Sequence, residues 1–139
     1  MAGETIITKL EKGRAEFAYE KVREVLSQDK KIQKEYRSYV KRLPQMILSN
    51  GLGQTIAFVF SKKAKKDQLN AYNFVYNHIS QYLESENTTR IKKDKAKPLE
   101  EWVISLNSLS YRYATEEVLT FLNWLRRFAE GMIETDEES

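Results

Sequence analysis

Residues 36–63 constrain the fold more than any other stretch, because two helical patterns meet there at a strong helix breaker. In the first pattern, apolar and aromatic side chains recur every three or four residues, at Tyr36, Tyr39, Val40, Leu43 and Ile47. Asn50-Gly51 then ends this pattern, and glycine suits the left-handed backbone that often closes a helix. The second pattern, Leu52–Phe60, is apolar on nearly all sides, which predicts a buried central helix. We therefore expect a buried helical corner flanked by basic residues.

Two further residues restrict the backbone near this corner. Pro44 lies inside the first helical pattern, where proline removes a backbone hydrogen bond at a cost of about 3 kcal/mol. A kink or a helix boundary is therefore expected near Leu43. Gly53 follows the break, at a position where a side chain would hinder close packing of the two helices.

The rest of the chain is also helical in pattern, and no segment alternates like a β-strand. Helices are expected over residues 5–28, 30–48, 52–60, 67–85, 98–106 and 108–133, with Asp67, Ser110 or Thr115 as candidate caps. This pattern predicts an all-α protein, a single compact helical bundle of five to six helices over residues 1–133. The polar segment 87–97 is expected to be an exposed, mobile loop, and residues 134–139 an acidic disordered tail.

Composition narrows the class of protein. Hydrophobic residues make up 41% of the 139 residues and charged residues 31%, and cysteine is absent, which excludes disulfides and thiolate metal sites. No apolar run reaches the length of a signal peptide or a membrane span, so a cytoplasmic protein is expected. Charge is uneven: the first 66 residues hold 15 Lys and Arg against 7 acidic residues, and the rest hold 8 against 13. Such asymmetry indicates a polyanionic partner, charge-complementary self-assembly, or solvated helix faces.

The residues needed for catalysis do not form a recognisable set. The single histidine, His78, has no cysteine partner and no carboxylate at ligand spacing on its own helix, so it is interpreted as a histidine at the core boundary. The Arg that helical ribonucleases place four to six residues before His is missing, since positions 72–74 are Tyr, Asn and Phe. Adjacent pairs such as Glu116-Glu117 diverge on a helix. We predict a protein that is not an enzyme and that holds no metal and no cofactor.

Basic side chains are candidates for binding RNA through its phosphates. One candidate group is Lys9, Lys12 and Arg14 near the N-terminus. No reader of base sequence is visible, and most of the eight tyrosines fall on core stripes, so any contact is expected to be insensitive to sequence. The RNA-binding candidates retained are Lys41, Arg42, Lys62, Lys63, Lys65, Lys66, Arg112, Arg126 and Arg127.

Two segments resemble the small subunit of Cmr-type (type III-B) CRISPR effector complexes. The first is the run Ser49, Asn50, Gly51, Leu52, Gly53, Gln54, Thr55, Ala57 and Phe58, preceded by a proline near the end of a helix. The second resembles the closing helix of that family and comprises Tyr111, Arg112, Ala114, Thr115, Glu116, Glu117, Leu119, Phe121, Leu122, Trp124, Leu125, Arg127, Phe128 and Ala129.

This resemblance implies a non-catalytic, all-helical structural subunit for antiviral defence. Copies would stack beside the backbone subunits and one another, and line the groove that receives guide and target RNA, while other subunits cleave. Pro44, Asn50, Gly51, Gly53 and Gln54 are then assigned to folding and subunit packing rather than to RNA. The alternative is a helical protein–protein adaptor that docks an acidic partner and binds no nucleic acid.

Overall fold

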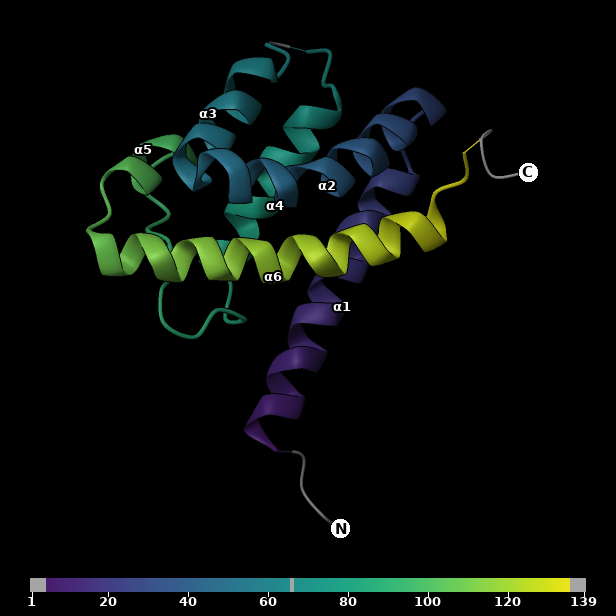
Figure 1. The fold of residues 1–139 in the computed structure, drawn as a ribbon. Helices are drawn as coiled ribbons and strands as arrows, with labels where there is room; N and C mark the ends of the chain where they lie inside the picture. Colours follow the sequence, from purple (N-terminus) through teal and green to yellow (C-terminus); the bar gives the residue numbers. More distant parts are fainter. Residues whose placement is uncertain (1–4, 66, 136–139) are drawn as a thin grey trace.

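Six α-helices make up the part of the chain that the computed structural model describes, residues 5–65 and 67–135, and this part contains no strand. The helices are α1 (Ile6–Leu26), α2 (Lys30–Asn50), α3 (Leu52–Lys62), α4 (Ala71–Glu84), α5 (Leu99–Ile104) and α6 (Ser108–Met132). Helix α6 crosses the front of the molecule in Figure 1 and packs against α1, α2 and α4. Helix α3 packs against α2, α4 and α5. The predicted all-α fold of five to six helices is confirmed.

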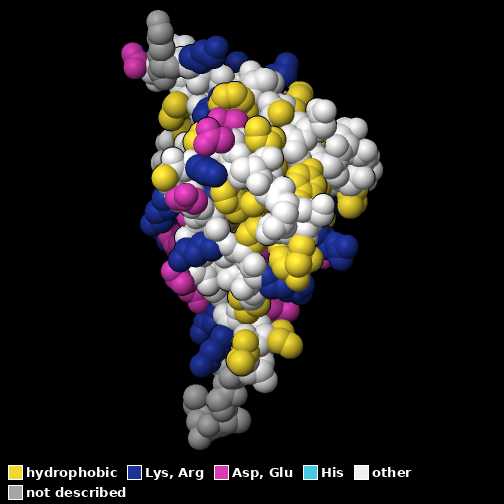
Figure 2. All heavy atoms as spheres, turned by 90° about the vertical axis from the view of Figure 1, so that its left-hand side faces the viewer, with side chains coloured by type: hydrophobic (Ala, Val, Ile, Leu, Met, Phe, Trp, Pro, Cys, Tyr) yellow, Lys and Arg dark blue, Asp and Glu magenta, His cyan; other side chains and the backbone are white. Residues whose placement is uncertain are grey.

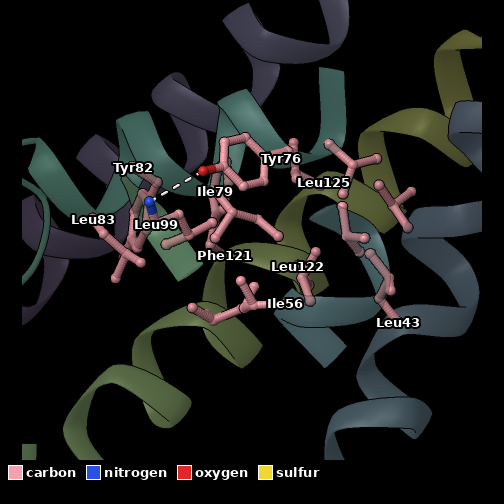
Figure 3. Close-up of a cluster of buried hydrophobic side chains, with 14 of the residues drawn as sticks. Leu43, Ile56, Tyr76, Ile79, Tyr82, Leu83, Leu99, Phe121, Leu122 and Leu125 are labelled. Atoms are coloured by element: carbon pink, nitrogen blue, oxygen red, sulfur yellow. Dashed lines mark hydrogen bonds between the residues drawn. The ribbon is translucent and has the colours of Figure 1, made fainter. Parts of the chain in front are cut away.

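The hydrophobic core lies where α2 to α6 converge. Figure 3 shows side chains from these helices pointing toward one another, among them Leu43, Ile56, Ile79, Leu122 and Leu125. The ring of Tyr82 stacks on Phe121 with centroids 4.3 Å apart. The hydroxyl of Tyr76 accepts the backbone N–H of Leu99 at 3.1 Å, which ties α5 to α4 (Figure 3). The tyrosines Tyr36 and Tyr82 are fully buried, in agreement with their stripe positions.

The predicted helical corner is present and turns at Gly51. This glycine has φ 90° and ψ 162°, a conformation in which residues with a Cβ are strained. Its N–H donates to the carbonyl of Ile47 at 2.8 Å, and its own carbonyl accepts from the N–H and the hydroxyl of Thr55. Gly51 therefore ends α2 and begins α3 in a single residue.

Tyr111 of α6 holds the far side of this corner. Its hydroxyl accepts the N–H of Gly53 at 2.8 Å, and it would lie 3.4 Å from a Cβ at Gly53 and 3.3 Å from one at Gly51. The helix that packs closely on Gly53 is thus α6. The expectation that Gly53 allows close packing against α2 is wrong. A backbone donor in the first turn of α3, where helices lack internal acceptors, is satisfied in this way.

Helix α2 continues through Pro44, so the helix does not end near Leu43, and of the two expected alternatives the boundary is wrong. The alternative, a kink at this point, stays a prediction. Burying an apolar side chain the size of leucine stabilises a protein by about 1.5–3 kcal/mol. Leu43 and Ile47, on either side of the proline, are 2% and 3% exposed. Together their burial offsets the roughly 3 kcal/mol that an internal proline costs.

Three other helices, α3, α4 and α6, each differ from the expectations in one respect. Helix α3 is not buried on all sides: Leu52, Ile56 and Val59 face the core, whereas Phe60 is 45% exposed. Helix α4 begins at Ala71 rather than near Asp67, because Asn70 and Asn73 form a reciprocal capping box. Helix α6 is capped by Asn107, whose side chain accepts the N–H of Ser110 at 2.8 Å, and not by Ser110 or Thr115.

The loop between α4 and α5 is attached to the body by a buried lysine. Lys93 is only 4% exposed, so the expectation of a fully exposed segment is wrong at this residue. Its backbone N–H donates to the carbonyl of Leu83 at 2.8 Å, and its ammonium group donates to Glu84 at 2.9 Å and to the carbonyls of Asp94 and Lys97. The mobility of this segment stays a prediction. Of the predicted acidic tail 134–139, residues 136–139 lie outside the described part of the chain.

Replacing Gly51 by alanine should destabilise the protein, while the same change at Gly131 should not. Gly51→Ala places a Cβ on a backbone with φ 90° and should lower the free energy of unfolding by about 1–3 kcal/mol. Gly131 is on α6, and a Cβ added there would have no neighbour within 4 Å, so Gly131→Ala should be neutral or stabilise by up to about 1 kcal/mol. Urea unfolding followed by circular dichroism measures both. Equal effects of the two changes would contradict the strain assigned to Gly51.

Candidate nucleic-acid interface

His78 is buried inside the bundle, so its interpretation as a boundary histidine is wrong. It is 1% exposed, its Nδ1 lies 2.8 Å from the hydroxyl of Tyr36, and its Nε2 lies 3.1 Å from Glu24. Burial lowers the pKa of His78 to about 4, although the Glu24 carboxylate acts in the opposite direction. The neutral ring therefore donates a hydrogen bond from Nε2 to Glu24 and accepts one at Nδ1 from the hydroxyl of Tyr36. Because Glu24 and Tyr36 come from α1 and α2, no spacing within α4 could reveal this contact.

Tyr36, His78 and Glu24 are residue types that occur in acid–base catalytic sites, but the His78 ring is not accessible to a substrate. A general base must come within hydrogen-bonding distance of the proton that it abstracts. The His78 ring is enclosed by α1, α2 and α4, with both nitrogens already engaged by Tyr36 and Glu24. The arrangement can link three helices, but it gives a substrate no access to the imidazole.

A second polar cluster centres on Glu117 of α6. Arg14 donates from one nitrogen to both carboxylate oxygens at 3.0 Å, and Tyr82 donates to one of them at 2.8 Å. The N–H and hydroxyl of Thr89 both donate to the other oxygen at 3.1 Å. Arg14 is thus turned into the protein as a partner of Glu117, which removes it from the candidate RNA-binding group. Across the described residues, no set of three or more His, Cys, Asp or Glu side chains could hold a metal ion.

The structure brings some of the predicted basic residues to one surface. Arg42 lies over the ring of Tyr39 at 5.3 Å, and Tyr39 stacks on Tyr72 with centroids 4.0 Å apart. Tyr72 meets Phe58 edge to face at 5.9 Å, and Lys62 lies over Phe58 at 5.7 Å. This row of rings joins α2, α3 and α4 and carries a cation at each end. We call these five residues the aromatic face.

The remaining candidates on α2 and α3 are less uniform. Lys41 is exposed beside Arg42, and Lys65 is exposed beyond the end of α3. Lys63 is half-buried, with its ammonium group 3.8 Å from the ring centroid of Tyr76, whose hydroxyl bonds to Glu100. It is therefore engaged inside the protein more than its neighbours. Lys66 lies outside the described residues.

The three candidate arginines of α6 do not form one patch. Arg112, Arg126 and Arg127 are all exposed, and Arg126 bonds to Glu130 at 3.4 Å. Arg112 and Arg126 are separated by about 21 Å along the helix axis, given a rise of about 1.5 Å per residue. On the face drawn in Figure 2, Lys and Arg side chains are likewise scattered among acidic and hydrophobic ones. The aromatic face is thus the most coherent grouping of the predicted cations.

An open hollow lies beside the aromatic face, at the corner between α2 and α3. It has a volume of about 660 Å³ and is lined by Met46, Ser49, Asn50, Gln54 and Phe58. The Asn50 and Gln54 side chains are accessible from this hollow and form no hydrogen bond with the described residues. Of the residues assigned to folding and subunit packing, Gly51 and Gly53 have roles in folding at the helical corner. The same assignment for Asn50 and Gln54 stays a prediction.

Comparison with known proteins decides the family. The family described as "CRISPR-associated protein (Cas_Cmr5)" matches residues 10–132. The chain belongs to this family. It is 32% identical over 120 residues to the "CRISPR system Cmr subunit Cmr5" of Thermus thermophilus, across 86% of this chain and 92% of that protein. A crystal structure of a CRISPR-associated Cmr5 family protein from the same organism matches with a TM-score of 0.70 and 31% identity, covering 89% of this chain and 97% of the other.

Membership in the Cas_Cmr5 family confirms the resemblance to the small subunit of Cmr-type effector complexes. The two segments that carried the resemblance both lie inside the matched range. They meet in the structure, because the hydroxyl of Tyr111 from the closing helix accepts the N–H of Gly53 from the corner. Within the described residues, none of the helices is both long and apolar enough to cross a membrane.

The burial of His78 predicts a loss of stability in mild acid. In the unfolded chain this histidine gains a proton near pH 6.5, whereas in the folded protein its pKa is about 4. The stability that the neutral ring contributes is complete above about pH 6.5 and is lost as the pH falls toward 4, by about 3 kcal/mol in total. Urea unfolding between pH 4.5 and 7.5 measures this loss.

The variant His78→Gln provides the control, since an amide can still contact Glu24 and Tyr36 but does not titrate. Apart from Glu24, which contacts His78, the other titrating groups keep the same surroundings in the two proteins. The difference in unfolding free energy between wild type and variant should therefore shrink as the pH falls. Parallel pH curves for the two proteins would show that His78 is not the group responsible.

Proposed function

We propose that the chain is a non-catalytic structural subunit of a type III-B (Cmr) effector complex that acts in antiviral defence in the cytoplasm. The observation that carries this proposal is the family match over residues 10–132, together with a relative named as a Cmr subunit that is covered almost completely. The subunit stacks along the backbone subunits and on further copies of itself, and it helps to line the groove for guide and target RNA. Cleavage belongs to other subunits.

The proposed RNA contact is made through phosphates by three cations, Lys41 and Arg42 of α2 and Lys62 of α3. Lys41, Arg42 and Lys62 are exposed and form no ion pair with the described residues. Cations of this kind can release counterions from RNA when they bind phosphate, which makes binding dependent on salt. The inward-facing Arg14, by contrast, is committed to Glu117.

Neutralising Lys41 and Arg42 should weaken RNA binding without harming the fold. The double variant Lys41→Gln/Arg42→Gln should bind single-stranded RNA more weakly and should lower the slope of log affinity against log salt by about 1.4, at about 0.7 for each lost phosphate contact. Fluorescence anisotropy at several salt concentrations measures both quantities, and circular dichroism checks the fold.

The matched control is Lys30→Gln/Lys31→Gln, which removes the same charge from exposed positions in the first turn of the same helix. An equal loss in both double variants would mean that overall charge, and not this site, attracts RNA. Unchanged RNA binding in Lys41→Gln/Arg42→Gln would contradict the proposed RNA contact.

Assembly is tested separately by isolating the tagged protein from its native host and sequencing the RNA that comes with it. Co-purification with backbone subunits and short CRISPR-derived RNAs is the expected result. Recovery of a single acidic protein without RNA would overturn the proposal in favour of an adaptor.

A further inference from the structure

A groove between α2 and α3 repeats the same order of side-chain types on both of its walls. On α2, Arg42, Met46 and Asn50 follow at intervals of four residues, and on α3, Gln54, Phe58 and Lys62 do the same. Residues four apart lie on one face of a helix. From the corner outward, each wall therefore presents an amide, then an apolar side chain, then a cation. We call these six residues the α2–α3 groove.

The turn at Gly51 is what places the two walls together. Met46, Asn50, Gln54 and Phe58 line the same hollow of about 660 Å³. Arg42 joins Met46 and Phe58 around a smaller gap, of about 30 Å³, next to the stacked rings of Tyr39 and Tyr72. The larger hollow falls within the range of about 300–1,000 Å³ that is usual for small-molecule sites.

The chemistry of the groove matches an unpaired nucleotide. Side-chain amides carry both donors and acceptors and can bond to the edge of a base. An aromatic ring gives any base a surface to stack on, and cations at the open ends can pair with the flanking phosphates. Among the described residues, no carboxylate lines either hollow. Glu35, one turn before Tyr39 on α2, is an acidic residue that interacts electrostatically with the Tyr39 side chain.

The fold itself does not account for the two amides. Asn50 is the last residue of α2 and Gln54 is in the first turn of α3, but the corner is closed by Gly51, Thr55 and Tyr111. Neither amide bonds to a described residue, and both side chains line the open hollow. They are available to a ligand there.

We propose that the α2–α3 groove binds an unpaired nucleotide of single-stranded RNA, with the base held between Met46 and Phe58 and against the amides of Asn50 and Gln54, while Arg42 and Lys62 pair with the flanking phosphates. This proposal rests on the RNA contact proposed above and adds a base contact to it. The contact is insensitive to sequence, because stacking and amide groups can serve every base.

The test compares two oligonucleotides of equal length, one an ordinary single-stranded RNA and the other with abasic sugars at its centre. Both carry the same phosphates. The full chain should bind the abasic oligonucleotide about tenfold more weakly, because it loses stacking and amide contacts. Fluorescence anisotropy at low salt measures both affinities.

The variant Asn50→Ala/Gln54→Ala removes the two amides. Both side chains are exposed at the open hollow, so the variant is expected to stay folded. It should weaken binding of ordinary RNA by about five- to tenfold, leave the salt slope unchanged, and have little effect on the abasic oligonucleotide. The matched control is Asn77→Ala/Gln81→Ala, which changes the same two residue types at the same spacing on the exposed face of α4. This control should bind both oligonucleotides like the wild type.

Other outcomes separate the two proposals. Equal affinity of the wild type for both oligonucleotides, with a normal salt slope, would overturn the base contact and leave the phosphate contact standing. Absence of salt-dependent binding to either oligonucleotide would overturn both. If Asn50→Ala/Gln54→Ala binds RNA normally but no longer co-purifies with the other effector subunits, the groove is a protein interface and the nucleotide proposal is wrong.

Discussion

The arrangement of the bundle depends on the reversal of the backbone at Gly51. A residue at φ 90° ends α2 and lets α3 leave in a new direction, and the hydroxyl of Thr55 secures the carbonyl at the turn. Tyr111 of α6 then bonds to the N–H of Gly53 from the other side. The corner is thereby fixed against the longest helix, and the apolar face of α3 is turned toward the core. Without that turn, the apolar face of α3 would not reach the core and the groove between α2 and α3 would not form.

Buried polar groups fix how the other helices meet. Arg14, Tyr82 and Glu117 join α1, α4 and α6, while the contacts of His78 with Glu24 and Tyr36 join α4 to α1 and α2. A buried charge left without a partner is strongly destabilising, so these contacts favour one register of the helices over others. His78 and Glu117 are therefore engaged in holding the bundle together.

The surface carries the features that the core does not explain. Arg42 of α2 and Lys62 of α3 lie at the two ends of a row of aromatic rings, and the amides of Asn50 and Gln54 border the adjoining hollow. The cations of α6 stay apart because they are spread along a long helix. The family match spans residues 10–132 and so includes all of this surface.

The sequence by itself determined the helices, the all-α class and the break at Gly51, because hydrophobic spacing and glycine conformation are local properties. The exposure of Lys41, Arg42 and Lys62 could also be predicted, whereas their contact with RNA stays a prediction. Only the tertiary structure decided that His78 is buried, that Arg14 points inward and that Lys93 anchors its loop. The first two depend on contacts with helices far along the chain, and the third depends on a loop that folds back on a helix. Periodicity along one helix shows which of its residues share a face, but not which other segment packs against that face.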